Sequence, residues 1–207
     1  MNRCIIIGGG EITRYDRLNG YLRDDDFAVF CDGGLYHAPH LRIAPGLIVG
    51  DFDSHAKPET ATETIVLPRE KDDTDTFFAA KEALKRGYEE FLLIGVTGGR
   101  LDHTLVNISI LLYLDTLHKK ARIVDDRSEM EIVSGQPVRI GGDCGSFSLL
   151  TVSGKASGIR ITGAKYPLEG GEITCDYQYG ISNEVMPGQT ATVSVEEGRL
   201  LLIRNMK

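Results

Sequence analysis

The chain has 207 residues, 42% of them hydrophobic and 26% charged, a composition typical of a folded globular protein and not of a disordered one. Its formal net charge of −7 argues against a nucleic-acid-binding protein, because such proteins carry a basic surface that neutralises phosphates. The sequence contains no apolar run of about 18 residues and no secretory signal, so we expect no membrane association and a cytoplasmic location.

Short apolar runs alternate with amphipathic stretches from residue 3 to about residue 125, which is the pattern of βαβ units. Several of these runs are continuously apolar, as expected for strands covered on both faces. We therefore expect a parallel sheet in a Rossmann-like α/β domain spanning residues 1–128. Its expected strands are Cys4–Ile7, Phe27–Cys31, Leu47–Gly50, Thr64–Leu67, Phe91–Val96 and Arg122–Asp125.

Two amphipathic stretches in this half predict helices, one within residues 73–87 that stops at Gly87 and one within residues 102–120. The first is expected to carry Phe78, Ala79, Glu82, Ala83 and Leu84. The second is expected to bury Leu105, Ile108, Leu112 and Tyr113.

The character of the sequence changes from about Glu131 onward, where glycines separate short segments of alternating polarity. Residues 147–153, 158–163, 190–198 and 200–205 show this alternation, and almost no helical period remains. We expect a smaller all-β domain, a sandwich, over residues 129–207.

Two other features are less specific. The cysteines at positions 4, 31, 144 and 175 form no CxxC pair, which favours reduced, mostly buried thiols over zinc ligation or a disulfide framework. The glycines at positions 8–10 do not complete a dinucleotide-binding fingerprint, and they indicate a close backbone approach or a sharp turn.

Acidic residues follow several expected strands, at the edge where open parallel sheets bind their ligands. Asp51 and Asp53 are two residues apart, so on an extended segment their side chains would point the same way. Asp72 and Asp75 are three apart at a helix start, which also places them on one face and leaves Asp73 pointing away into solvent. Like charges this close repel unless a cation or a proton lies between them. Carboxylate oxygens suit Mg²⁺, which in turn implies a polyphosphate substrate.

The same residues allow simpler interpretations. The second acidic group can instead cap the helix and compensate its dipole. Lys71 and Arg100 supply positive charge, and Arg100 follows a glycine pair that lets the backbone approach phosphate, although alone it would favour a surface salt bridge. His103 is either a general base or an ordinary polar contact at a helix start.

Five motifs occur in a fixed order along nearly the whole chain: CDGG at 31–34, GLIVGDFDS at 46–54, EKDDTD at 70–75, TGGRLDHTLVNI at 97–108 and GISNE at 180–184. Together with an α/β half followed by an all-β half, this set resembles the thiamin pyrophosphokinase family. The resemblance implies transfer of a pyrophosphoryl group from ATP to the primary hydroxyl of thiamin, giving thiamin diphosphate and AMP. It also implies Mg²⁺ and a homodimer, with each site between the α/β domain of one subunit and the β domain of the other.

The resemblance also implies roles for individual residues. The catalytic residues would be Asp51, Asp53, Asp72, Asp75 and Arg100, with Asp51, Asp53 and Asp75 binding Mg²⁺ and Arg100 holding the triphosphate. The substrate-binding residues would be Asp32, Lys71, Thr74, Asp102, His103, Asn107, Ser182 and Asn183, the last two contacting thiamin from the partner subunit. Glu184 and Val185 stand where some family members carry an aromatic residue. Ring stacking on thiamin would therefore come from elsewhere, with Tyr177 and Tyr179 as candidates, or be absent.

Three alternative functions fit the same residues. A related pyrophosphokinase would act on another alcohol, such as a pterin. A thiamin- or nucleotide-binding sensor would keep the pocket but produce no AMP. A metal-dependent phosphohydrolase would release product from ATP without any acceptor.

Overall fold

The computed structural model describes residues 3–52, 59–70 and 72–206. The chain divides into two units, Met1–Asp126 and Arg127–Lys207, and each has its own architecture. Asp53 and Lys71, two of the residues singled out above, lie outside the described residues.

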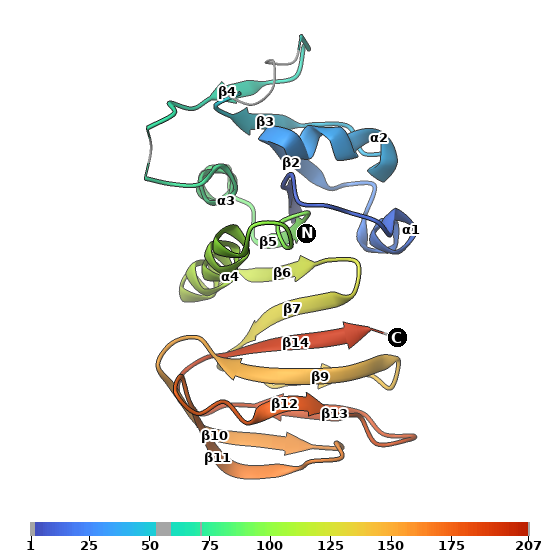
Figure 1. Cartoon of the computed structure of the whole chain (residues 1–207), viewed down its shortest axis with the longest axis vertical. Coiled ribbons are helices and arrows are strands. Elements are labelled where there is room, and N and C mark those ends of the chain that lie inside the picture. Colours follow the sequence, from blue (N-terminus) through green and yellow to red (C-terminus); the bar gives the residue numbers. More distant parts are fainter. Residues whose placement is uncertain (1–2, 53–58, 71, 207) are drawn as a thin grey trace. The chain divides into compact units, whose positions relative to one another are not determined.

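The first unit contains a parallel sheet of six strands in the order β6-β5-β1-β2-β3-β4 (Figure 1). Their bounds are β1 Arg3–Ile7, β2 Phe27–Cys31, β3 Leu47–Gly50, β4 Thr64–Val66, β5 Glu90–Ile94 and β6 Lys120–Val124. The six expected strands and their parallel pairing are therefore confirmed, with ends that differ by one or two residues. The strand order places the exits of β1, β2, β3 and β5 side by side, as a ligand site at this edge requires.

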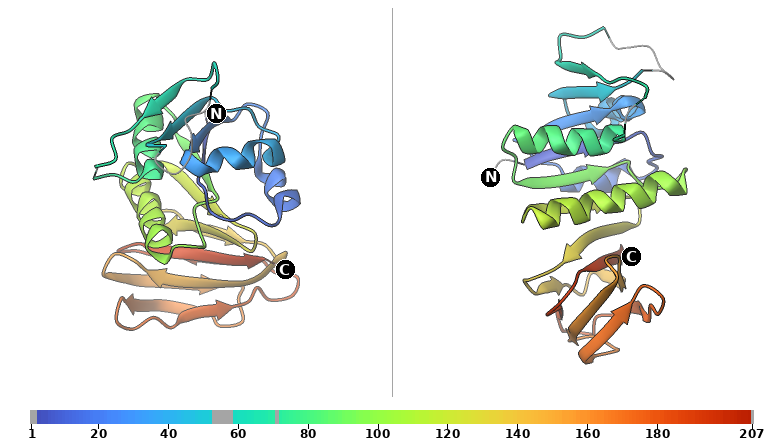
Figure 2. Two further views of the ribbon diagram at one scale, coloured as in Figure 1. Left: turned by 45° about the horizontal axis from the view of Figure 1, so that its top comes forward. Right: turned by 90° about the vertical axis from the view of Figure 1, so that its left-hand side faces the viewer.

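Helices cover both faces of this sheet. The longer helices α3 (Asp75–Lys85) and α4 (Leu101–Thr116) lie together in front of the strands in the right-hand view of Figure 2. The short helices α1 (Tyr15–Leu18) and α2 (Ala38–Leu41) lie on the opposite face, as Figure 1 also shows. A short 3-10 helix adjoins each of them: η1 (Asn19–Tyr21) follows α1, and η2 (Asp32–His37) precedes α2.

The helices exist where expected, but the buried face of α4 differs from the prediction. Helix α3 ends at Lys85, close to the expected stop at Gly87, and buries Ala79, Ala80 and Ala83, whereas Phe78, Glu82 and Leu84 are only partly buried. Helix α4 buries Asn107, Ile110, Leu111 and Leu114, while Leu105 is 58% exposed and Ile108, Leu112 and Tyr113 are partly buried. The apolar residues of α4 are spread around the helix and not gathered on one face, so its sequence contains too little contrast to fix the inward face.

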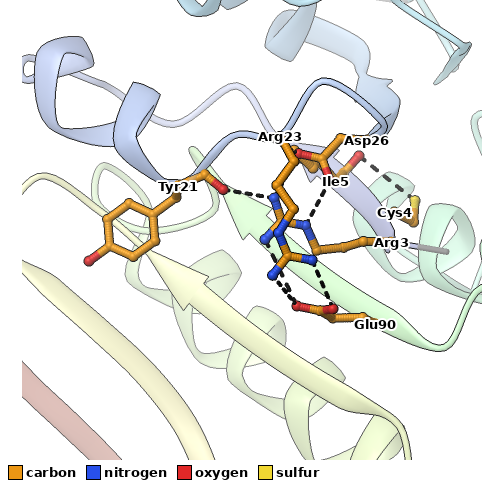
Figure 3. A network of polar contacts seen from close by, with 7 residues as sticks. All are labelled: Arg3, Cys4, Ile5, Tyr21, Arg23, Asp26 and Glu90. Carbon is orange, nitrogen blue, oxygen red and sulfur yellow. Dashed lines mark hydrogen bonds and ion pairs between the residues drawn. The ribbon is translucent and has the colours of Figure 1, made fainter. Parts of the chain in front are cut away.

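Ionic contacts join the amino ends of the strands (Figure 3). Arg3 donates from Nε and Nη2 to the two carboxylate oxygens of Asp26, both at 2.7 Å, and from Nη2 to the carbonyl of Tyr21 at 2.7 Å. Arg23 donates to Glu90 at 3.0 and 3.1 Å. The side chains of Arg3 and Asp26 are 8% and 0% exposed, so this bidentate pair is buried.

The second unit consists of two antiparallel sheets. One runs β12-β9-β14-β7 and the other β11-β10-β13-β8. The bounds are β7 Ser128–Val133, β8 Val138–Ile140, β9 Cys144–Thr151, β10 Lys155–Thr162, β11 Leu168–Thr174, β12 Gly180–Asn183, β13 Ala191–Ser194 and β14 Leu200–Met206. Residues of both sheets, including Phe147, Ile159 and Leu202, share one apolar cluster. This confirms the expected sandwich.

Two remaining expectations concern thiols and membranes. All four cysteines are free, and three are buried, but Cys175 is exposed. Within the described residues, no helix has the length and hydrophobicity needed to cross a bilayer.

Candidate active site

A cavity of about 660 Å³ opens at the carboxyl ends of the strands of the first unit. It is lined by the segments that follow β1, β2, β3 and β5, by the segment before α3 and by the first turns of α3 and α4. The described lining residues are Gly8, Gly9, Gly10, Glu11, Cys31, Asp32, Gly33, Asp51, Arg69, Asp72, Asp73, Thr74, Asp75, Thr76, Gly95, Val96, Thr97, Gly98, Gly99, Arg100, His103 and Asn107.

One side of the cavity is bare backbone, formed by Gly8, Gly9 and Gly10, here called the glycine wall. The Gly8 and Gly10 N–H groups donate to the carbonyls of Ile94 and Gly95 at 2.9 and 2.7 Å. A Cβ at Gly8 or Gly10 would lie 2.6 or 2.7 Å from the Gly95 oxygen. The close backbone approach expected for these glycines is therefore confirmed, and its partner is the end of β5.

Carboxylates from three consecutive points of the sheet edge line the same cavity: Asp32 after β2, Asp51 after β3 and Asp75 at the start of α3. Asp32 has a φ of 43°, in the left-handed region that non-glycine residues rarely adopt. Such backbone strain is concentrated at functional sites. The structure thus brings together the acidic residues that the sequence had placed at separate strand ends.

The segment after β3 differs from the extended geometry assumed for Asp51 and Asp53. Phe52, between them, has a φ of 52° and is half-buried, so the chain turns here and the strict alternation of side chains does not apply. The expectation of an extended backbone at Phe52 is wrong for this reason, and its side chain is only partly buried.

The lining suits a hard cation in chemistry, because Mg²⁺ prefers a few carboxylates together with water and phosphate oxygens. Among the residues that the structure describes, no three Asp, Glu, His or Cys side chains are close enough to hold a metal by themselves. Asp51 and Asp75 line the cavity. The third expected ligand, Asp53, lies outside the described part of the chain.

The start of α3 is capped by a threonine and not by an aspartate. Thr74 accepts a hydrogen bond from the Phe77 N–H at 3.2 Å, and Asp75 is the first helical residue. Asp73 is not turned into solvent as expected, because both of its carboxylate oxygens accept from Lys81 Nζ at 2.9 and 2.8 Å. The capping role that the sequence allowed for Asp72 and Asp75 therefore belongs to Thr74.

Asn107 connects α4 to two other parts of the site. Its amide nitrogen donates to the Val96 carbonyl at 2.7 Å, and its amide oxygen accepts from the Thr76 hydroxyl at 2.7 Å. The Thr76 hydroxyl in turn lies 3.1 Å from that of Thr74. Asn107 is 5% exposed, so these bonds fix the start of α3 against the exit of β5.

Arg100 and Asp102 form an exposed ion pair in which Arg100 Nη2 lies 2.5 Å from Asp102 Oδ2. Hydrogen bonding to the Arg100 guanidinium lowers the pKa of Asp102 below its usual value, and the same bond raises the pKa of Arg100. The surface salt bridge, which the sequence made the less favoured alternative for Arg100 beside its glycine pair, is thus present. Arg100 and His103 line the cavity, whereas Asp102 is not among its lining residues.

Ser182 and Asn183 belong to the second unit. Ser182 is exposed and has a φ of 59°, and its N–H donates to the Ser148 hydroxyl at 3.1 Å. Asn183 is buried, and its side-chain amide bonds to both the N–H and the carbonyl of Tyr166, at 3.0 and 2.8 Å. These contacts fix Asn183 in place. The rings of Tyr177 and Tyr179 lie 5.4 Å apart, and both are exposed.

Several lining residues were missed from the sequence, chiefly Arg69, Glu11 and Thr76. Arg69 is exposed, and its guanidinium makes no ion pair within the described part of the chain. A basic residue next to an acidic run, as in PREKDD at 68–73, was the available signal. Glu11 and Thr76 carried no comparable signal, since only the fold brings them to the cavity.

Comparisons with known proteins agree over the whole chain. The family model described as thiamin pyrophosphokinase, catalytic domain, matches residues 18–124, and that of the vitamin B1 binding domain matches residues 139–200. Thiamine pyrophosphokinase of Bacillus subtilis (strain 168) is 30% identical over 213 residues, covering 99% of each chain. The crystal structure of thiamine pyrophosphokinase from Bacillus subtilis has a TM-score of 0.87 at 27% identity, covering 100% of both chains. That of Geobacillus thermodenitrificans reaches 0.83 at 29% identity, covering 100% of this chain and 98% of the other.

Proposed function

The chain belongs to the thiamin pyrophosphokinase family and is an ATP-dependent transferase that makes thiamin diphosphate, and on this premise we propose that its reaction takes place in the cavity of the first unit. The observation that carries this proposal is the convergence of Asp32, Asp51 and Asp75 on one cavity with a glycine wall and two arginines. An acidic site facing bare backbone and guanidinium groups suits a metal-bound polyphosphate.

Mg²⁺ would be held by Asp51, Asp53 and Asp75. Two of these line the cavity, and carboxylates are the donors that this cation takes. When bound, the cation would neutralise charge on the phosphate oxygens.

The cationic side chains would bind the triphosphate. The Arg100 guanidinium would break its ion pair with Asp102 and bind phosphate oxygens in its place. Lys71 would add a further positive charge. Arg69 extends this set, since it lines the cavity without an ion-pair partner in the described chain. Bidentate guanidinium contacts are well suited to phosphate.

In the transfer itself, the thiamin hydroxyl oxygen attacks the β-phosphorus of ATP, and the bond from that phosphorus to the oxygen bridging it to the α-phosphate breaks. AMP leaves with that oxygen, and the hydroxyl proton is lost. The transition state of such a transfer is loose, so positioning and charge neutralisation matter more than strong base catalysis.

The remaining residues of the site would position the substrates. Asp72, which is exposed and lines the cavity, would orient the hydroxyl. Asp32 and His103 would contact substrate, while Thr74 and Asn107 would act mainly by fixing the start of α3. Asp102 would act through Arg100.

The second unit would bind thiamin. The vitamin B1 binding model covers residues 139–200, which contain Ser182 and Asn183. We propose that these two residues contact thiamin bound to the partner subunit of a cytoplasmic homodimer.

Support for a dimer comes from the apolar side chains exposed on the first half of α4, Leu101 at 70%, Leu105 at 58% and Val106 at 39%. Sedimentation of the purified protein tests this, and a monomer at micromolar concentration would exclude it.

The decisive experiment mixes the protein with Mg²⁺, ATP and thiamin and identifies the nucleotide product. AMP together with thiamin diphosphate is expected. ADP as the product would contradict pyrophosphoryl transfer, and AMP formed with a pterin but not with thiamin would indicate a different acceptor. Nucleotide cleavage without any acceptor would indicate a phosphohydrolase, and binding without product a sensor.

The metal can be tested without an activity readout. A ligand that binds the native state alone stabilises it by mass action, by roughly 1.4 kcal/mol at ten times Kd. We expect Mg²⁺ with a non-hydrolysable ATP analogue to raise the melting temperature more than either alone. An identical melting temperature in all three conditions would remove Mg²⁺ from the proposal.

A further inference from the structure

His37, the last residue of η2, contacts the glycine wall but has no place in the chemistry proposed above. The side chain is buried, with 8% exposure. Its Nε2 lies 3.0 Å from the carbonyl oxygen of Gly10, and its Nδ1 lies 2.7 Å from the hydroxyl oxygen of Tyr15. Because a carbonyl oxygen can only accept, Nε2 carries the proton and Nδ1 accepts from the tyrosine. Both ring nitrogens are therefore committed to one tautomer and one orientation.

The backbone of Gly10 is held by hydrogen bonds at both its N–H and its carbonyl, and His37 supplies the second of these. On one side, the Gly10 N–H donates to the Gly95 carbonyl at 2.7 Å. On that side the packing is also tight, since a Cβ at Gly10 would lie 2.7 Å from the oxygens of both Gly95 and Thr97. On the other side, His37 holds the carbonyl. Hydrogen bonds therefore hold the glycine wall on two sides, to the segment after β5 and to η2.

The local sequence explains how His37 reaches this position. Gly34, three residues earlier, lies so close to β1 that a Cβ there would be 2.2 Å from the Ile7 oxygen. Glycine therefore allows η2 to pack directly on the end of β1. The ring of Tyr15 also stacks on that of His40, with centroids 4.7 Å apart, which holds the tyrosine in place to bond His37.

The orientation of Gly10 determines which backbone donor is available beside the cavity. In a trans peptide the carbonyl and the next N–H point in opposite directions. Fixing the Gly10 carbonyl on His37 therefore also fixes the N–H of Glu11, a residue that lines the cavity. Within the described part of the chain, no hydrogen bond uses this N–H. It is a donor of the kind that phosphate oxygens accept.

We propose that His37 is a positioning residue for ATP, because it holds the Gly10 carbonyl and so orients the glycine wall and the Glu11 N–H toward the triphosphate. The inference rests on the proposed function, in which this cavity binds the nucleotide. It predicts an effect on the Michaelis constant for ATP that is separate from the effect on thiamin. It also predicts that the N–H donor of His37 matters more than its ring.

The test is steady-state kinetics of the full-length protein with ATP and thiamin varied separately. His37→Phe keeps a ring but removes both hydrogen bonds, and we expect KM for ATP to rise roughly tenfold, as for the loss of a hydrogen bond to a buried group. Turnover and KM for thiamin should change by less than about twofold. His37→Gln restores an N–H donor and should bring KM for ATP to within about threefold of the wild type.

His40→Phe is the matched control, since His40 is exposed and phenylalanine keeps a ring that can stack on Tyr15. Its kinetics should equal those of the wild type. An unchanged KM for ATP in folded His37→Phe would overturn the proposal. So would a parallel worsening of turnover and of both Michaelis constants without rescue by His37→Gln, which would indicate a merely structural role.

Should His37→Phe fail to fold, Tyr15→Phe decides the question. Tyr15→Phe leaves the bond to Gly10 but releases Nδ1, so KM for ATP should rise by about twofold, with thiamin unaffected. A wild-type KM for ATP in Tyr15→Phe would overturn the proposal. Formation of AMP and thiamin diphosphate by the wild type tests the proposed function independently of any outcome at His37.

Discussion

The two ends of the parallel sheet in the first unit use charge in opposite ways. At the amino ends, Arg3 and Asp26 form a buried bidentate pair and Arg23 binds Glu90, so that positive and negative groups match. At the carboxyl ends, the described lining of the cavity contains six acidic residues and two arginines. Buried charge is costly unless it is compensated. At the amino ends of the strands, the protein itself balances the charges. At the carboxyl ends, the excess of carboxylates suits a bound cation together with a polyphosphate.

The largest expected effect tests the amino end. Asp26→Asn should lower the free energy of unfolding by about 3 kcal/mol, because it removes the bidentate carboxylate of the buried Arg3 guanidinium and leaves, of the described carboxylates, only Glu90 at 3.9 Å. Urea denaturation measures this change. Turnover of the folded variant should stay close to that of the wild type. Asp24→Asn, at an exposed neighbour, is the control and should change stability by less than about 0.5 kcal/mol. Equal effects of the two substitutions would show that the ion pair contributes nothing specific.

The carboxyl end should show the reverse pattern. Asp51→Asn is expected to lower turnover at least about a hundredfold, a barrier increase near 2.7 kcal/mol, with stability nearly unchanged. Asp73→Asn removes a carboxylate of the same cavity whose charge is already matched by Lys81, so turnover should fall far less. Similar losses in both variants would mean that the total negative charge matters and that Asp51 has no particular role.

A smaller effect is expected at the cap of α3. Thr74→Ala removes the acceptor for the Phe77 N–H and should destabilise the protein by about 1 kcal/mol. Thr74→Ser keeps the hydroxyl and should recover most of that stability. Thermal unfolding of the two variants provides the measurement. Identical melting temperatures for the alanine and serine variants would show that the cap is unimportant here.

The smallest effect is a pH dependence that arises at His37. Burial lowers the pKa of His37 below its usual 6.5, because the charged imidazolium is poorly solvated. The unfolded chain therefore binds this proton more readily than the native state, so stability is retained above pH 6.5 and lost as the pH falls below it. The loss of unfolding free energy between pH 7.5 and 5.5 should be smaller in His37→Gln. An equal loss in the variant would assign the acid sensitivity to other groups.

The sequence predicted the elements of the fold well, because strand signals are local. Runs such as Leu47–Gly50 are apolar on both faces and need no tertiary information to be recognised. It failed on the inward face of α4, as at Leu105, because a helix whose apolar residues are spread around it is oriented by its neighbours. It also failed at Phe52, where a left-handed backbone interrupts the alternation assumed for Asp51 and Asp53.

For the site, the amino-acid pattern specified the available chemistry: carboxylates at successive strand exits, glycines beside them, arginine nearby and the motifs of one enzyme family. The fold was needed to show which of these groups share a cavity, that Thr74 caps α3 while Lys81 pairs with Asp73, that Arg69 lines the cavity and that His37 bonds the Gly10 carbonyl. Residue type and backbone preference are local properties. Contacts between side chains from different strands depend on the order and packing of the whole sheet.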